Sequence, residues 1–199
     1  MIGTDSVNDL IPSLYCAGSA VLDAISDLTG YAAVRVPLQR ASLPGEFTLN
    51  VPGYRQIDSF SCGAVAGAMA VKFLRPGLSF ERIYETVDPC RQTGVGTARM
   101  LRALRSLGIR VNHQADLTFH DICGALQSGS PVLACVSTRQ PDVTHWVTIY
   151  GFGLKPHALF VAGQGLPFVG RQRIAWKHFA RLWLPAGAGL VCRKKSKSR

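Results

Sequence analysis

The sequence predicts a single domain of the α+β class in which helices precede strands. Three segments with helical periodicity lie between residues 62 and 107, and most of the strand-like segments follow them, with one further helix in between. This order is typical of folds in which helices pack on an antiparallel sheet. The 199 residues suit one domain, and 47% hydrophobic with 17% charged residues exclude a disordered chain. We therefore expect an N-terminal helical part packed on a C-terminal antiparallel sheet.

Caps and stops define the expected helices. The first begins at Cys62 after Ser61, a fair N-cap, and its apolar character almost all round predicts burial. Ser79 is expected to cap the second, and Gly108 to follow the third as a C-cap residue. The expected helices cover residues 62–74, 79–87, 97–107 and 119–127, and the expected strands cover residues 47–51, 110–112, 131–137, 145–150 and 159–162.

The chain divides into three parts by composition and pattern. Residues 1–45 form a lead-in of uncertain role with a helix over 19–28 and an extended stretch over 32–36, and residues 46–185 form the domain. Residues 186–199 are expected to be a basic tail, because five of the 22 basic residues lie within 193–199 and account for much of the net charge of +10. Such runs are more often solvated termini than phosphate-binding elements. We therefore expect no nucleic-acid partner, and nothing in the sequence indicates an oligomeric state.

The expected cellular location of the protein rests on the absence of a membrane-spanning segment, a secretory signal and paired cysteines in the sequence. No uncharged apolar run reaches the roughly 18 residues of a membrane-spanning helix, and Asp5 and Asp9 stand where a secretory signal carries positive charge. The six cysteines form no CxxC pair, which favours reduced thiols in a cytoplasmic protein.

The chain offers weak candidates for metal ligands. His120 and Cys123, with His113 and Asp116 nearby, loosely resemble the spacing of a zinc site, but no second Cys or His pair repeats the pattern. Neither a metal nor an organic cofactor is expected.

Cys62 differs from the other cysteines because it begins a buried helix. Unpaired backbone N–H groups and the helix dipole favour an anion at this position, which would lower the pKa of the thiol. A thiolate attacks carbonyl carbon, so Cys62 is a candidate nucleophile, and Gly63 would let a substrate backbone approach. The alternative is that Cys62 is a small core residue like most cysteines in apolar helices.

Two further side chains could complete such a site. Gln56 lies six residues before Cys62, where its amide could donate to a developing oxyanion, although a surface amide is the simpler interpretation. His145 begins the alternating segment HWVTIYGF, and among the five histidines it alone heads a clear core strand. This position suits a fixed general base, and the alternative is an edge histidine hydrated by solvent.

The motif QIDSFSCGA from Gln56, followed much later by HWVTIYG from His145, resembles the papain-like bacteriocin-processing peptidases, which cut after a double-glycine leader, and their stand-alone relatives. The resemblance continues through residues 96–111 and 129–136 to the closing IAWKHFARLW, and it covers residues 47–184. It implies a papain-like cysteine peptidase fold in which Cys62 attacks, His145 moves the proton and Gln56 helps to form the oxyanion hole.

One departure from this family concerns the third catalytic member. The family places an Asp-Pro pair after the next strand, whereas this chain reads LFVAGQGLP there, with Gly163 and Gln164 at or beside the expected position. The Gln164 amide oxygen could hold the imidazole tautomer, with less electrostatic help than a carboxylate gives. The third partner could also be absent.

The sequence therefore leaves three functions open. The first is a stand-alone cysteine peptidase or amide hydrolase that forms a Cys62 thioester with a peptide or protein substrate. The second is a papain-like module without catalysis that binds a peptide or protein partner, and the third is a Cys-dependent acyltransferase. Each of them predicts a cleft between Cys62 and His145.

Overall fold

The structure, a computed structural model, describes residues 33–36, 43–56, 58–137, 143–163 and 172–195. The helices are α2 (Cys62–Leu74), α3 (Phe80–Val87), α4 (Thr97–Ser106), α5 (Phe119–Gln127) and α6 (Trp176–Leu182). The strands are β1 (Ala33–Val36), β2 (Glu46–Thr48), β3 (Gly53–Gln56), β4 (Ile109–Gln114), β5 (Val132–Ser137), β6 (Thr144–Leu154), β7 (His157–Ala162), β8 (Gln172–Ala175) and β9 (Trp183–Lys194).

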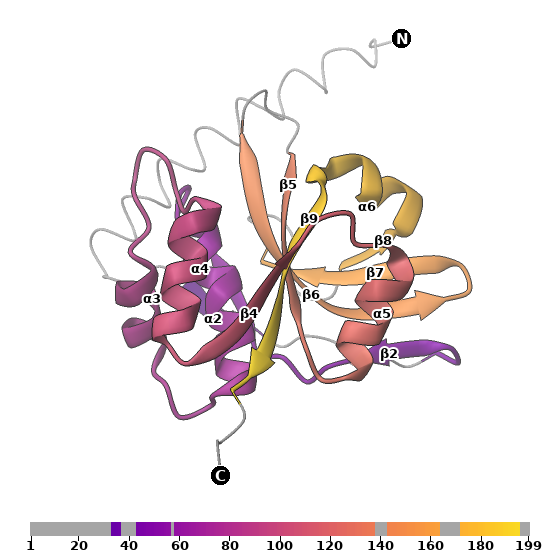
Figure 1. The fold of residues 1–199 in the computed structure, drawn as a ribbon, viewed down its shortest axis with the longest axis horizontal. Helices are drawn as coiled ribbons and strands as arrows, with labels where there is room; N and C mark the ends of the chain where they lie inside the picture. The colour runs from indigo at the N-terminus through magenta and orange to yellow at the C-terminus, as the bar shows by residue number, and fades with distance from the viewer. Residues whose placement is uncertain (1–32, 37–42, 57, 138–142, 164–171, 196–199) are drawn as a thin grey trace, which may run out of the picture.

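A seven-stranded sheet forms the centre of the molecule. Six strands follow the order β4-β9-β5-β6-β7-β8, and β2 pairs with β6, while β1 and β3 form a separate two-stranded sheet. Every strand pairing is antiparallel. Helices α2, α3 and α4 lie together on one side of the molecule and α5 and α6 on the other (Figure 1). The predicted α+β class, with a helical part packed on an antiparallel sheet, is confirmed.

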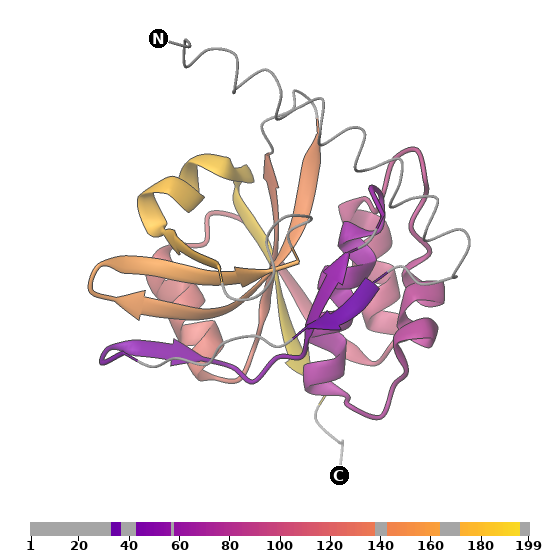
Figure 2. The same ribbon diagram turned by 180° about the vertical axis from the view of Figure 1, so that it is seen from behind.

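Small residues let α2 pack closely against the sheet. Its sequence CGAVAGAMAVKFL is buried over most of its length, as predicted, and the Thr148 hydroxyl on β6 donates to the Ala66 carbonyl on α2 at 2.9 Å. Leu133, Trp146 and Leu190 from three adjacent strands join the same core cluster as α2 and α4. Figure 2 shows α2 from behind, with β1 and β3 beside it.

The opposite face of the sheet is covered by α5 and α6. Helix α5 begins with a capping box, in which the Asp121 backbone N–H donates to the Thr118 hydroxyl oxygen and the Thr118 backbone N–H donates to the Asp121 carboxylate. Alternation along the strands sends Ala134, Val147 and Val191 to this face, where they form a second core cluster with residues of both helices. The sheet therefore separates an α2 side from an aromatic side.

Strand β9 corrects the prediction that a basic tail begins at residue 186. Residues 189–194 pair with β4, and β9 also pairs with β5, so this segment lies inside the sheet. Leu190, Val191 and Cys192 are buried, which the sequence pattern alone did not connect to a partner strand. The alternation is interrupted by glycines and Pro185, and long-range pairing supplies the hydrogen bonds that local sequence does not reveal.

The boundary at residue 45 also differs from the structure. The extended stretch expected over residues 32–36 is present as β1, and it pairs with β3 in a register that places Ala33 opposite Gln56. Part of the lead-in is therefore joined to the strand that carries a predicted site residue. Strand β3 was not predicted, and the helix expected over residues 19–28 lies outside the described residues.

Candidate active site

Cys62 is the first residue of α2, and its side chain is buried, with 7% exposure. The backbone N–H groups of Trp146 and Gly63 face its sulfur. Gly63 is required by close packing, because a Cβ there would lie 2.6 Å from Val95 Cβ and 3.2 Å from Trp146 Cδ1. The nucleophile candidate is thus held against the segment that contains His145.

Burial overturns the predicted pKa of this thiol. Removal from water raises the pKa of Cys62, the Asp58 carboxylate raises it further, and the N–H donors of Trp146 and Gly63 lower it without prevailing. The start of the helix by itself would favour the thiolate. The free energy needed to bury the thiolate exceeds the stabilisation by these N–H donors, so the resting group is a thiol. Attack on a substrate therefore requires a base that removes the thiol proton.

His145 lies near the start of β6 and is half-buried. Its Nε2 lies 2.6 Å from the carbonyl oxygen of Gly163, which follows β7. A carbonyl only accepts, so Nε2 carries the proton and Nδ1 is left as the basic nitrogen of the neutral ring. Burial lowers the pKa of His145, and the hydrogen bond to Gly163 opposes this shift. The neutral imidazole is the form that can take a proton from a thiol.

Trp146 connects the two candidates. Its backbone N–H faces the Cys62 sulfur, and its indole Nε1 donates to the Val95 carbonyl at 2.7 Å. Trp146 is buried at 5% exposure and directly follows His145 in the chain. Two residues more than eighty positions apart in the sequence are therefore attached to segments that touch at Trp146.

Gln56 ends β3 and is buried at 3% exposure. Its amide Nε2 donates to Asp58 Oδ1 at 3.2 Å, and its Oε1 is buried without a partner among the described residues. The surface interpretation of Gln56 is therefore wrong. An amide nitrogen has two hydrogens, so one remains after the bond to Asp58.

Asp58 is the residue that sequence reasoning missed. Its Oδ1 accepts from the backbone N–H groups of Phe60 at 3.1 Å and Ser61 at 2.7 Å, and so it shapes the turn that leads into Cys62. Its Oδ2 is buried with no partner among the described residues. Burial and then the Asp58 carboxylate raise the pKa of Tyr84 to about 12. An Asp three residues before a Ser that precedes a helix was the available signal, since Asp side chains build such turns.

The structure describes one partner of His145 near the predicted third catalytic position. Gln164 lies outside the described residues, so its interpretation as the orienting residue stays a prediction. The described partner of His145 at this place is the main-chain carbonyl of Gly163, a residue with φ of +98°. Only glycine adopts this backbone conformation without strain, so Gly163 fits the position that it occupies.

The described residues offer no evident place for a metal ion. No group of three or more His, Cys, Asp or Glu side chains in these ranges could hold one. His120 stacks edge-on to Phe119 instead, and Cys123 is one of five free cysteines among the described residues.

Within the described ranges, no helix has the length and apolarity to span a bilayer.

Comparison with known proteins identifies the fold class. No family model matches the sequence, and no curated protein matches it. The structure is similar to the peptidase domain of Streptococcus ComA, a bi-functional ABC transporter involved in quorum sensing, with a TM-score of 0.57 and 21% identity over 71% of this chain and 96% of that one.

Two further solved structures agree. A double-glycine motif protease from an AMS/PCAT transporter, solved with its leader peptide, has a TM-score of 0.55 and 16% identity over 81% of this chain and 99% of that one. A protein described as a C39-like peptidase from Bacillus anthracis has a TM-score of 0.54 and 14% identity over 83% and 99%. The chain therefore has the papain-like fold of the double-glycine peptidase domains, as the sequence motifs indicated.

Proposed function

We propose that this protein is a cysteine peptidase or amide hydrolase that cleaves a peptide through a Cys62 thioester. The observation that carries the proposal is the hydrogen bond between His145 Nε2 and the Gly163 carbonyl, beside the segment that faces the Cys62 sulfur. This bond fixes one tautomer and so prepares Nδ1 as the base.

The proposed reaction begins from a neutral pair. Nδ1 of His145 takes the thiol proton while Cys62 Sγ attacks the carbonyl carbon of the substrate, and the oxyanion that forms accepts hydrogen bonds from Gln56 Nε2 and the Cys62 backbone N–H. The C–N bond then breaks, and His145 returns the proton to the leaving amine. Water attacks the thioester, with His145 again as base, and releases the acid.

The partner of His145 in this structure is a neutral carbonyl, which assists the proposed reaction less than a carboxylate would. The Gly163 carbonyl can orient the imidazole, but it carries no full charge to stabilise the imidazolium that forms during attack. We therefore expect a slower enzyme than one with an Asp at this place. Gln164 is proposed to assist from the next position in the chain.

The fold and one similar structure support a peptide as the proposed substrate. A protease with the same fold was solved with a leader peptide, and we propose a peptide substrate for this chain as well. No residue of the described site suggests a nucleotide or metal requirement. Whether water or an amine accepts the acyl group decides between hydrolysis and acyl transfer, and product mass with and without added amine distinguishes them.

A peptide-based electrophile tests the proposal more sharply than a simple alkylating agent. Cys90 is half-buried, and hydrogen bonds from Thr93 and Gln92 lower its pKa, so we expect it to react as well and to serve as an internal reference. We expect a peptidyl vinyl sulfone to modify Cys62 and His145→Ala to slow this reaction by about 10²–10⁴-fold while Cys90 reacts unchanged.

The matched control is His157→Ala, which removes an exposed histidine on the aromatic side. The proposal is wrong if Cys62 in the His145→Ala variant reacts as fast as in the wild type, or if His157→Ala slows it equally. Peptide mapping by mass spectrometry reads both cysteines in one sample.

A binding module without catalysis is the second candidate, and two observations favour it. The thiol is buried with a raised pKa, and no carboxylate among the described residues contacts His145. This alternative predicts that Cys62→Ala binds a peptide as well as the wild type does, and that the wild type releases no product over long incubation.

A further inference from the structure

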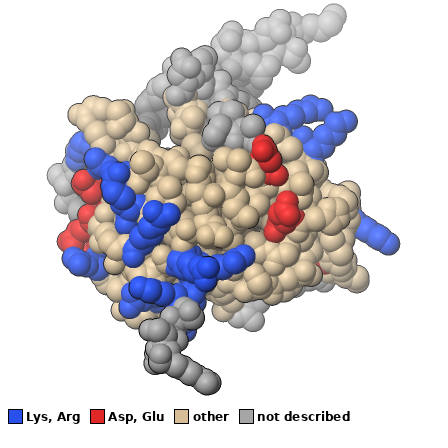
Figure 3. Space-filling model, in the orientation of Figure 1, with Lys and Arg blue, Asp and Glu red and all other residues tan. Residues whose placement is uncertain are grey.

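A strip of positive charge surrounds the edge of the sheet formed by β4 and the end of β9. We call it the basic edge, and all its members are exposed: Arg75, Arg102, Arg105, Arg110, Arg193, Lys194 and Lys195. Figure 3 shows Lys and Arg side chains gathered at the lower part of the face where Figure 1 places α4, β4 and the end of β9.

No acidic residue interrupts this strip. The sequences of α4 (TARMLRALRS), β4 (IRVNHQ) and β9 (WLPAGAGLVCRK) contain neither Asp nor Glu. Within the described ranges, Asp88 pairs with Arg99 at the start of α4 and Glu46 pairs with Arg173, and neither arginine belongs to the basic edge. The charge of the basic edge is therefore not neutralised by the described part of the protein.

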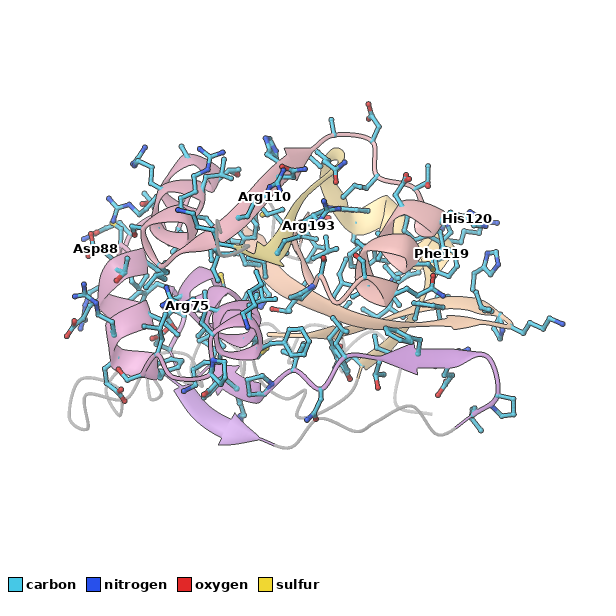
Figure 4. All side chains as sticks on the ribbon, turned by 60° about the horizontal axis from the view of Figure 1, so that its bottom comes forward. Arg75, Asp88, Arg110, Phe119, His120 and Arg193 are labelled. Carbon is cyan, nitrogen blue, oxygen red and sulfur yellow. The ribbon has the colours of Figure 1, made fainter. Side chains whose placement is uncertain are left out.

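The central pair of arginines violates a rule of sheet stability. Arg110 and Arg193 are directly opposite in the antiparallel register of β4 and β9 (Figure 4). Like charges at opposed positions destabilise a sheet, and no described residue compensates for them. Local rules are broken most often where function requires it, so this pair points to an anionic partner.

The basic edge has charge on both faces of the sheet. Ile109, Val111 and Cys192 point into the core beside α2 and α4, so Arg110 and Arg193 point to the opposite face. Lys194 alternates back to the side of α4. Arg75 lies on that side too, where its Nη1 donates to the Leu107 carbonyl at 2.7 Å.

We propose that the basic edge binds the phosphate backbone of a double-stranded nucleic acid. Five of its seven members are arginines, whose planar guanidinium matches phosphate oxygens in pairs. No aromatic side chain belongs to it, which disfavours single strands because these bind by base stacking. A flat membrane would contact only one of the two charged faces of the sheet. A membrane-binding surface would also need apolar side chains, and the large hydrophobic residues that are exposed in the described ranges lie outside the basic edge: Leu43, Val143 and Leu154.

The basic edge is separate from the candidate active site. Strand β5 gives a common scale for the two sites. His145 pairs with Val136 near one end of β5, and Val191 pairs with Val132 at the other end. Arg193 lies two residues beyond Val191, and therefore about six residues along the sheet from His145. At about 3.3 Å per residue this separation is about 20 Å. Nucleic-acid binding and peptide cleavage can therefore be tested independently. The sequence-based expectation of no nucleic-acid partner assumed that these charges belong to a solvated tail, whereas β9 holds Arg193 and Lys194 in the sheet.

Fluorescence anisotropy with a labelled duplex of mixed sequence, as DNA and as RNA, tests the proposal on the full chain. We expect affinity to fall steeply between about 50 and 200 mM salt, because each phosphate contact contributes about 0.9 to the slope of log K against log salt. Arg110→Thr/Arg193→Thr should reduce that slope by about 2. The same variant should keep or raise its melting temperature, because two opposed like charges are gone.

The matched control is Lys177→Gln/Arg181→Gln, which removes two exposed charges from α6 and changes the net charge equally. An equal loss of binding in both variants, or no binding of either duplex, overturns the proposal. Tighter binding to phosphatidylserine vesicles or to polyglutamate than to the duplex also overturns it, because the partner would then be a membrane or an acidic protein.

Discussion

The two faces of the central sheet are built on different principles. On the α2 side, small residues bring a helix close to β6, and buried polar atoms of Gln56 and Asp58 are left without partners among the described residues. On the other side, α5 and α6 enclose an aromatic cluster, and no described residue of these helices has such an atom. Under the proposed function, Gln56 Oε1 and Asp58 Oδ2 are therefore buried polar atoms that a substrate could contact on the side of Cys62.

We expect the aromatic cluster to contribute mainly to stability. Phe179 is buried at 1% exposure, with its ring 5.3 Å from that of Trp183 and 6.4 Å from that of Trp176. We expect Phe179→Ala to lower the free energy of unfolding by about 3–5 kcal/mol because it leaves a cavity. Chemical denaturation measures this, and the folded fraction should keep the wild-type rate of Cys62 modification. A changed rate would mean that the two faces are coupled.

Close packing at the start of α2 predicts a smaller loss that does reach the site. In Gly63→Ala the new Cβ would lie 2.6 Å from Val95 Cβ and 2.9 Å from Val95 Cγ2. Overpacking should lower the free energy of unfolding by about 1–3 kcal/mol and slow Cys62 modification. Val95→Ala should restore both.

Gly67→Ala is the control for this prediction. Its Cβ meets the flexible Met100 Sδ at 3.3 Å, and alanine favours a helix by about 1 kcal/mol, so stability should change little. Thermal unfolding of the three variants together decides whether Gly63 is restricted by packing or by helix propensity.

Asp58→Asn removes a charge while keeping an oxygen that can accept from Phe60, Ser61 and Gln56. Since the Asp58 carboxylate raises the pKa of Cys62, the variant should have a lower Cys62 pKa. The thiolate then forms at lower pH, and the curve of modification rate against pH moves to the acid side. A curve that stays in place would leave Asp58 as a purely structural residue of the turn.

The smallest expected effect concerns the third catalytic position. Replacing Gln164 by Asp should raise the rate of peptide cleavage modestly if this side chain can reach His145, because a carboxylate stabilises the imidazolium. The measurement is kcat/KM for a peptide substrate. An unchanged value would leave the Gly163 carbonyl as the sole orienting group of the proposal.

Local sequence predicted the elements whose signals are contiguous. Helix α2 follows from its apolar run, α3 from Ser79, whose hydroxyl accepts from the Arg82 backbone N–H at 3.1 Å, and α4 from its periodicity and Gly108. Strands β5, β6 and β7 lie where alternation and apolar runs placed them. The position of Cys62 at a helix start was predicted in the same way, because a nucleophile candidate is recognised by its neighbours in the chain.

Other features could not be predicted because they depend on distant partners. Residues 189–194 have no interpretable pattern until β4 and β5 supply their hydrogen bonds. The direction of the Cys62 pKa depends on burial by segments far away in the sequence, and this outweighs the helix start. A main-chain carbonyl such as that of Gly163 leaves no signature among side chains.

The sequence by itself determined the class of fold, the helix that presents Cys62 and the strand that begins beside His145. Periodicity and caps are local, and a few residues suffice to specify them. Only the tertiary structure decided that Asp58 shapes the turn before Cys62, that a backbone carbonyl holds His145, and that the terminal basic residues form a charged edge. These features are contacts between segments, and their energies exist only once the chain has folded.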